Sequence, residues 1–202
     1  MKKAYIGVTG FTKPEQVEAA VCTYRDALPK AGAMPPHVLM VGVLASSKSL
    51  AGIPNKYPLR YPDRYEIERI FPVPSDATLN LIHYATGGAT DGLAHDLTEA
   101  MTWAGSRCQG IQINAAWPMP DQVQRFSHRY PEARVVLQLG PGALERFNWN
   151  ASQIANRVRD LYGTTVTDVL VDVSGGRGTS EGLTKAHEIV SALQDMDAWT
   201  VG

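Results

Sequence analysis

An excess of charge of one sign is missing from this sequence, and so is any long apolar run. The 202 residues carry 19 lysines and arginines against 20 aspartates and glutamates, a formal net charge of −1. Such a balance gives no general electrostatic attraction to nucleic acid or to anionic lipid. No apolar stretch approaches the roughly 20 residues that span a bilayer. We therefore expect no nucleic-acid partner and no membrane partner.

Cysteine is almost absent. Neither Cys22 nor Cys108 has a cysteine or histidine partner at the spacing of a zinc site, so we expect no metal. Two cysteines also do not form the kind of disulfide framework that is typical of small secreted proteins. Residues 1–7 lack the apolar core of a signal peptide and pass straight into a strand pattern. These absences predict a cytoplasmic protein, and we expect no cofactor.

Short apolar segments alternate with helical patterns along the whole chain. The strands are predicted at 4–9, 37–44, 79–84, 110–114, 134–139 and 168–172. The helices are predicted at 12–20, 91–103, 121–128, 152–161 and 183–193. A repeat of about 30 residues is typical of βαβ units, which build a parallel sheet.

Six such units fit a doubly wound open sheet or a (β/α)₈ barrel, and the barrel typically needs about 250 residues. Residues 198–202 look like the first half of a seventh strand, whereas an open sheet is expected to end in a helix or a polar edge. We predict an α/β fold: one domain over 1–202, a TIM-type barrel that is incomplete after about six units and the start of a seventh strand. The open barrel edges also predict a homodimer.

Residues 46–65 interrupt the alternation. This insert contains three tyrosines and the cations Lys56, Arg60 and Arg64. Long irregular segments in compact domains are usually functional or disordered, and disordered segments contain few aromatic residues. We predict an ordered loop over the C-terminal ends of the strands, where its cations can meet an anionic ligand. The alternative is a surface loop held in place by tyrosine packing.

Polar residues end several of the otherwise apolar strands, at the position where barrels carry their chemistry. His83 and Asp172 are the candidates for general acid and base catalysis. The other predicted site residues bind substrate: Thr9, Lys48, Asn114, Gln138, Gly175, Gly176 and Arg177. The last three belong to a glycine-rich turn whose backbone N–H groups can approach an anion, although a plain βα turn also uses glycine.

Residues 6–15, Ile-Gly-Val-Thr-Gly-Phe-Thr-Lys-Pro-Glu, resemble the first strand of the phosphoribosylanthranilate isomerase family, normally Lys-Ile-Cys-Gly-Leu-Thr-Arg-Pro-Glu. Residues 42–49 and 111–115 are similar to its second and fourth strands. Residues 170–173 and 175–179 are similar to its Leu-Leu-Asp and Gly-Gly-Thr-Gly motifs. The resemblance runs the length of the chain. It implies a TIM-barrel isomerase of tryptophan biosynthesis, with Asp172 as its general acid.

The chain also departs from that family's pattern. The family's general-base cysteine falls on Thr9, its substrate-binding arginine on Ala51 and its strand-four histidine on Asn114. A hydroxyl is far too weakly acidic to replace a thiolate. We expect an isomerase or related lyase that acts on a small phosphorylated or anionic metabolite by acid/base proton transfer. The alternative is a non-catalytic or diverged small-molecule-binding barrel that has lost the general base.

Overall fold

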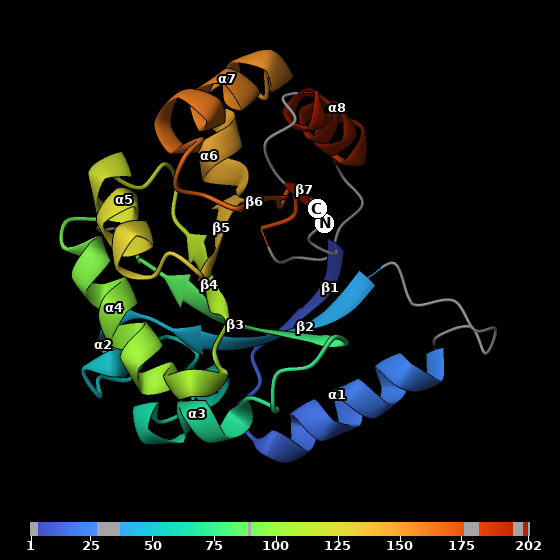
Figure 1. Cartoon of the computed structure of the whole chain (residues 1–202). Helices are drawn as coiled ribbons and strands as arrows, with labels where there is room; N and C mark the ends of the chain where they lie inside the picture. Colours follow the sequence, from blue (N-terminus) through green and yellow to red (C-terminus); the bar gives the residue numbers. More distant parts are fainter. Residues whose placement is uncertain (1–3, 28–36, 89, 176–181, 196–199, 202) are drawn as a thin grey trace. The chain divides into compact units, whose positions relative to one another are not determined.

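The computed structural model describes residues 4–27, 37–88, 90–175, 182–195 and 200–201, and strands alternate with helices throughout them (Figure 1). The strands are β1 (Ala4–Thr9), β2 (His37–Ala45), β3 (Thr78–Ala85), β4 (Gly110–Asn114), β5 (Arg134–Leu139), β6 (Asp168–Val171) and β7 (Thr200–Val201). The longer helices are α1 (Pro14–Ala27), α4 (Leu93–Ala104), α5 (Pro120–Arg129), α7 (Ala151–Tyr162) and α8 (Leu183–Gln194). The short helical segments are α2 (Ser47–Leu50), η1 (Pro58–Arg60), η2 (Arg64–Glu66), α3 (Ile67–Ile70), η3 (Gly105–Arg107) and α6 (Pro141–Glu145).

The strands form one sheet in the order β1-β2-β3-β4-β5-β6-β7. The pairs β1–β2, β2–β3, β5–β6 and β6–β7 are parallel. A doubly wound sheet reverses its strand order at a switch point, and this order contains no reversal. Successive right-handed crossovers in one direction bring the helices to one face. The fold is therefore α/β, an incomplete TIM-type barrel, and β7 adds the predicted seventh strand beside β6.

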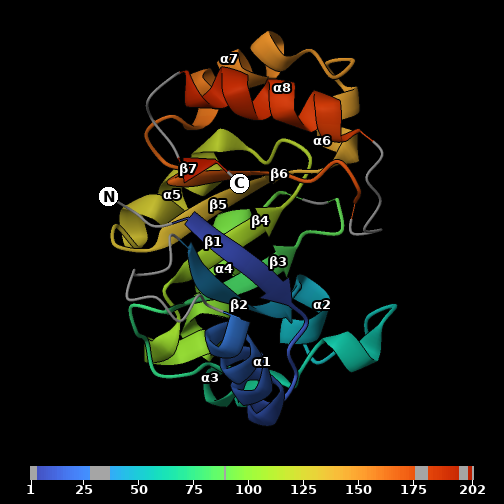
Figure 2. The ribbon, with the colours of Figure 1, turned by 90° about the vertical axis from the view of Figure 1, so that its right-hand side faces the viewer.

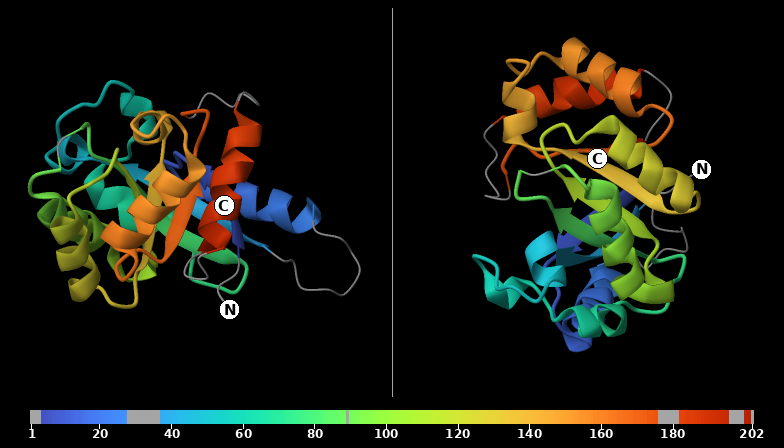
Figure 3. Two further views of the ribbon diagram at one scale, coloured as in Figure 1. Left: turned by 90° about the horizontal axis from the view of Figure 1, so that it is seen from above. Right: turned by 90° about the vertical axis from the view of Figure 1, so that its left-hand side faces the viewer.

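The chain divides into two compact units. The first contains Met1–Ala85 and Asp96–Ile111, and the second contains Thr86–His95 and Gln112–Gly202. Within the second unit, α7 and α8 lie side by side (Figures 2 and 3).

In the first unit, β1 and β2 approach closely because glycine faces a larger side chain. Thr9 pairs with Gly42, where a β-carbon would lie 2.6 Å from Cγ2 of Thr9. Along β2 and β3, Gly42 pairs with Leu81 and Leu44 pairs with His83. Since paired residues of parallel strands share a face and alternate residues return to it, Thr9 and His83 lie on the same face.

In the second unit, the two faces of the sheet differ in polarity. Val135, Leu137 and Leu139 of β5 are buried and apolar on one face, and the alternating positions on the other face are Arg134, Val136 and Gln138. Strand β6 follows the same pattern, with apolar Val169 between positions 168 and 170. The amphipathic helices α5 and α7 bury Val123, Phe126, Ile154 and Val158, among others. Such apolar helix faces pack on the apolar face of a sheet, which leaves the polar side chains on the opposite face.

The predicted strands agree with the observed ones to within one residue at each end. The first helix, predicted at 12–20, extends to Ala27. The short helices α2, α3 and α6 were not predicted, because four or five residues are too few to show helical periodicity. The insert at 46–65 forms α2, η1 and the start of η2. Its place over the C-terminal ends of the strands stays a prediction.

Candidate functional site

Asp172 directly follows β6, and hydrogen bonds hold its half-buried carboxylate from two sides. Its Oδ1 accepts from the backbone N of Ser174 at 3.1 Å, from Oγ of Ser174 at 3.0 Å and from the backbone N of Gly175 at 2.9 Å. Its Oδ2 accepts from Nε2 of Gln138 at 2.9 Å. All four partners are donors, and this arrangement fits an ionised carboxylate, which can only accept.

The turn after Asp172 depends on a glycine. Gly175 has a φ of 58°, a left-handed conformation that favours glycine, and a β-carbon there would lie 3.3 Å from Cγ of Pro141. Gly175 therefore lets the chain fold back onto the Asp172 carboxylate beside the start of α6. Gly176 and Arg177, which complete the predicted anion-binding turn, lie outside the described residues.

A row of side-chain amides runs from Asp172 along the polar face of β5 and β4. Nε2 of Gln112 donates to Oε1 of Gln138 at 2.9 Å, and the two residues are 2% and 6% exposed. Gln112 was not among the predicted site residues. The signal for it was present in the sequence, because Gln112 stands two residues before Asn114 and so shares that residue's face of β4.

A second carboxylate on β6 has a different kind of partner. Asp168 is 1% exposed, and it accepts from Nε and NH2 of Arg134 at 2.8 and 2.5 Å. Oγ1 of Thr167 also donates to it, at 2.5 Å. The two-pronged contact places an arginine fork on a carboxylate at the N-terminal ends of β5 and β6, the end that contributes stability in barrels.

The loop after β4 contains a strained aromatic residue. Trp117 has a φ of 59°, which is uncommon for a bulky side chain. Its indole Nε1 donates to the carbonyl of Ala143 at 2.9 Å, and its ring packs edge-on against Phe147 at 5.2 Å. The hydroxyl of the buried Tyr162 also donates to the carbonyl of Pro118 at 2.5 Å. These contacts fix the loop that follows Asn114 against α6 and α7.

The other predicted residues are distributed over both units. Thr9 and His83, in the first unit, are half-buried at the ends of β1 and β3, and Lys48 is exposed on α2. Asn114, in the second unit, is exposed at the end of β4. Gln138 and Asp172 also belong to the second unit, where they are in direct contact. Convergence of all these residues at one site stays a prediction.

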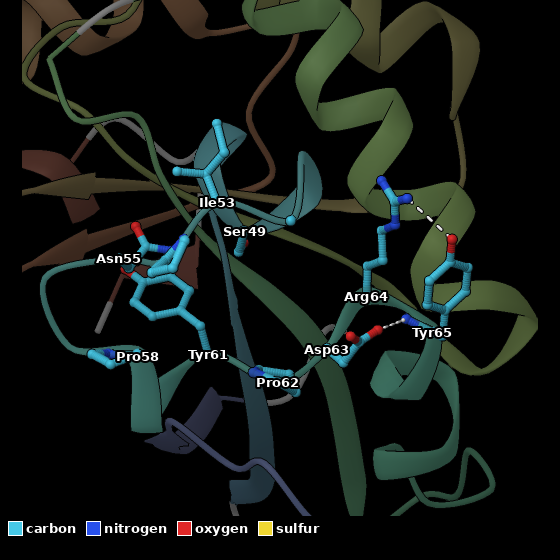
Figure 4. Close-up of a pocket in the computed structure, with 11 residues that line it drawn as sticks. Ser49, Ile53, Asn55, Pro58, Tyr61, Pro62, Asp63, Arg64 and Tyr65 are labelled. Carbon is cyan, nitrogen blue, oxygen red and sulfur yellow. Dashed lines mark hydrogen bonds between the residues drawn. The ribbon is translucent and has the colours of Figure 1, made fainter.

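The insert surrounds a pocket of about 330 Å³ (Figure 4). That volume is at the small end of the range of roughly 300–1,000 Å³ found for small-molecule sites. The lining residues are Ser49, Gly52, Ile53, Pro54, Asn55, Pro58, Tyr61, Pro62, Asp63, Arg64 and Tyr65. Figure 4 shows the hydrogen bond from Arg64 to the Tyr65 hydroxyl, which is 3.0 Å long.

The three cations of the insert have different surroundings. Arg64 donates to the carbonyl of Leu50 at 2.6 Å and lies 5.0 Å from the ring of Trp103, so it holds the insert together. Lys56 lies 5.3 Å from the centre of a tyrosine ring. Within the described ranges the guanidinium of Arg60 makes no ion pair or hydrogen bond, and its Nε would lie 3.7 Å from a β-carbon on Gly10. Of the three cations, Arg60 therefore lies against the end of β1.

Burial raises the pKa of the Cys108 thiol to about 11. At neutral pH it is therefore a thiol and not a nucleophilic thiolate. Burial and a 2.6 Å hydrogen bond to Asp96 also raise the pKa of Tyr84. Both groups stay protonated at neutral pH and have structural partners.

In the part of the chain that the structure describes, no three histidine, cysteine or acidic side chains are grouped so that they could hold a metal ion. None of the described helices is both long enough and apolar enough to cross a membrane. No protein-family model matches the chain, and neither a curated protein nor a solved structure matches it at a significant level.

Proposed function

We propose that this protein is a cytoplasmic enzyme that transfers protons on a small phosphorylated or anionic metabolite, as an isomerase or related lyase resembling phosphoribosylanthranilate isomerase. The observation that carries the proposal is the Asp172 carboxylate, which lies at the C-terminal end of β6, half-buried and fixed in orientation. Its partner across the sheet is a neutral amide. The negative charge of the carboxylate is therefore not neutralised by that partner and can serve in proton transfer.

The proposed roles follow the chemistry of each group. Asp172 exchanges a proton with the substrate, and His83 supplies the second proton-transfer group. Thr9 orients the ligand through its hydroxyl but cannot replace a thiolate base. Asn114, Lys48 and the turn that contains Gly175, Gly176 and Arg177 contact the anionic part of the substrate.

The test is a thermal-shift screen of phosphorylated and carboxylated metabolites, followed by assays of turnover for each ligand that stabilises the protein. We expect Asp172→Asn to lower kcat by about 100-fold or more, the usual size of a general acid or base contribution. His83→Asn should lower it similarly, and Thr9→Ala much less. Full activity in Asp172→Asn would rule out the proposed proton transfer.

A second function, binding without catalysis, is favoured by the four donors around Asp172, since they satisfy the carboxylate without any substrate. In that case a metabolite would stabilise the parent protein and Asp172→Asn equally, and neither would turn it over. The two functions therefore differ in the response of a single variant.

We also propose a homodimer formed through the sheet edges. Strands β1 and β7 end the strand order, and Ile6 and Val8 of β1 are 52% and 41% exposed. β1 carries neither charge nor proline, the features that protect edge strands from pairing with other chains. Sedimentation equilibrium should show a dimer that Val8→Lys converts to a monomer. A monodisperse monomer of the parent protein would contradict the proposal.

A further inference from the structure

We propose that Gln112 and Gln138 form an amide relay that fixes Asp172 as a proton acceptor, so that Gln138 positions the carboxylate and does not contact the substrate. The inference rests on the proposed function in one respect, namely that Asp172 is the group that reacts with the substrate. It concerns how the second unit prepares that group before any substrate arrives.

Both polar ends of Gln138 make hydrogen bonds inside the protein. Its Nε2 donates to Oδ2 of Asp172 and its Oε1 accepts from Gln112, both at 2.9 Å. The residue is 6% exposed. The amide keeps a second N–H and a second lone pair, but so little exposed surface leaves a ligand little access to either. Its place therefore favours a positioning role over substrate binding.

The hydrogen bonds of the amide row all run in one direction, toward Asp172. An amide can present either its oxygen or its nitrogen to a neighbour, whereas an ionised carboxylate can only accept. Asp172 therefore requires the nitrogen of Gln138, which in turn directs the oxygen of Gln138 to Gln112 and requires the nitrogen of Gln112. One carboxylate thus sets the orientation of two buried amides in succession. Conversely, the amides favour the acceptor form of the carboxylate.

The direction of the amide row decides which way Asp172 first moves a proton. With donors on both oxygens, resting Asp172 accepts the first proton. That proton leaves the substrate for a carboxylate oxygen of Asp172, while its electron pair stays on the substrate, and the return of the proton restores the carboxylate. The resemblance implies that Asp172 is a general acid, whereas the relay assigns it the part of the base in the first step.

The experiment records the side-chain amide signals of the glutamines by ¹⁵N NMR on the full chain, without substrate. We expect Asp172→Asn to shift the signals of Gln138 and also those of Gln112, which donates to Gln138. An asparagine can donate as well as accept, so it no longer imposes one direction on the row. In a Gln138→Leu background, Asp172→Asn should leave the Gln112 signals unchanged. Gln138→Met serves as the second background if the leucine variant fails to fold.

The matched control is the exposed pair of Gln122 and Asp121, in which Nε2 donates to Oδ2 at 3.0 Å. Asp121→Asn should shift the signals of Gln122 and of no other glutamine. The relay is contradicted if Asp172→Asn leaves the amide signals of Gln112 unchanged. It is also contradicted if Asp172→Asn shifts those signals equally when Gln138 is replaced by leucine or methionine. Because these signals need no turnover, a relay that responds in a protein inactive on every screened metabolite would contradict the proposed function alone.

Discussion

Two carboxylates lie on the same face of β6, one at its start and one just after its end. Each is held by a side chain of the neighbouring strand β5, and both pairs of residues are spaced four apart. Asp168 is held by Arg134, and Asp172 is held by Gln138. Asp168 is 1% exposed and faces a cation, whereas Asp172 is half-buried and faces a neutral amide. The same two strands therefore present one carboxylate that is neutralised and one that is only oriented.

Under the proposed function, this difference separates a structural carboxylate, Asp168, from one that takes part in proton transfer, Asp172. A buried charge needs a countercharge, because removing it from water is costly. A partly exposed carboxylate needs only hydrogen bonds to hold its orientation, and its charge then remains for a substrate proton. The position along the strands agrees with this division, since Asp168 lies at the N-terminal end and Asp172 at the C-terminal end.

Arg134→Gln should have the largest effect on stability, because it replaces the cation beside Asp168 with a neutral amide, the kind of partner that Asp172 has. We expect a loss of about 3–5 kcal/mol in the free energy of unfolding, since the Asp168 charge is left buried without a countercharge. Denaturant titration measures the loss. Adding Asp168→Asn should recover part of it, and a loss of less than about 1 kcal/mol would show that the ion pair is not structural.

Cys108 shows the effect of burial on a titratable group, because burial raises the pKa of its thiol more than the backbone hydrogen bonds lower it. Its Sγ lies 3.2 Å from the carbonyl of Gly110, and burial raises its pKa to about 11 from an ordinary value of 9.0. Between these values the folded state keeps a proton that the unfolded state has lost, so stability falls as the pH rises. We expect the parent to lose about 2 kcal/mol relative to Cys108→Ala from pH 9 to 11. Parallel pH profiles would contradict this.

Gln138→Met sharpens the comparison by removing the amide while keeping the length of the side chain. We expect a loss of about 1.5 kcal/mol, because the bond from Gln112 to Gln138 and the bond from Gln138 to Asp172 are both removed. The loss should be smaller than that of Arg134→Gln, as urea titration of the two variants side by side would show. A larger loss would mean that Asp172, like Asp168, is chiefly structural.

Asp121 is an exposed carboxylate that serves as a reference, because it contacts both an amide, Gln122, and a cation, Arg125. NH2 of Arg125 lies 3.7 Å from its carboxylate, and the side chains are 72% and 50% exposed. Asp121→Asn should change the free energy of unfolding by less than about 0.5 kcal/mol, because exposed pairs contribute little. A larger change would mean that the contribution of a carboxylate to the free energy of unfolding depends more on its partner than on its burial.

Much of the fold could be predicted from the sequence, because uninterrupted apolar runs such as 134–139 identify buried parallel strands. The position of Asp172 was predicted by the same reasoning, since a polar residue directly after such a run lies at the end of a strand. Gln112 and the pairing of Arg134 with Asp168 were missed. Their bonds join residues on different strands, and the register between strands is set by tertiary packing rather than by local pattern. The contacts of Arg64 with Leu50 and Trp103 could not be predicted either, because they join residues that are far apart in the sequence.

The most direct test of the division between the two carboxylates is the free energy of unfolding of Asp168→Asn and Asp172→Asn, measured by urea titration under identical conditions. Asp168→Asn should lose about 3 kcal/mol, because the two-pronged contact between Arg134 and the buried carboxylate at position 168 is then lost. Asp172→Asn should lose less than about 1 kcal/mol, since asparagine can still accept from Ser174 and Gly175 and the amide row can reverse. Equal losses, or a larger loss for Asp172→Asn, would contradict the account.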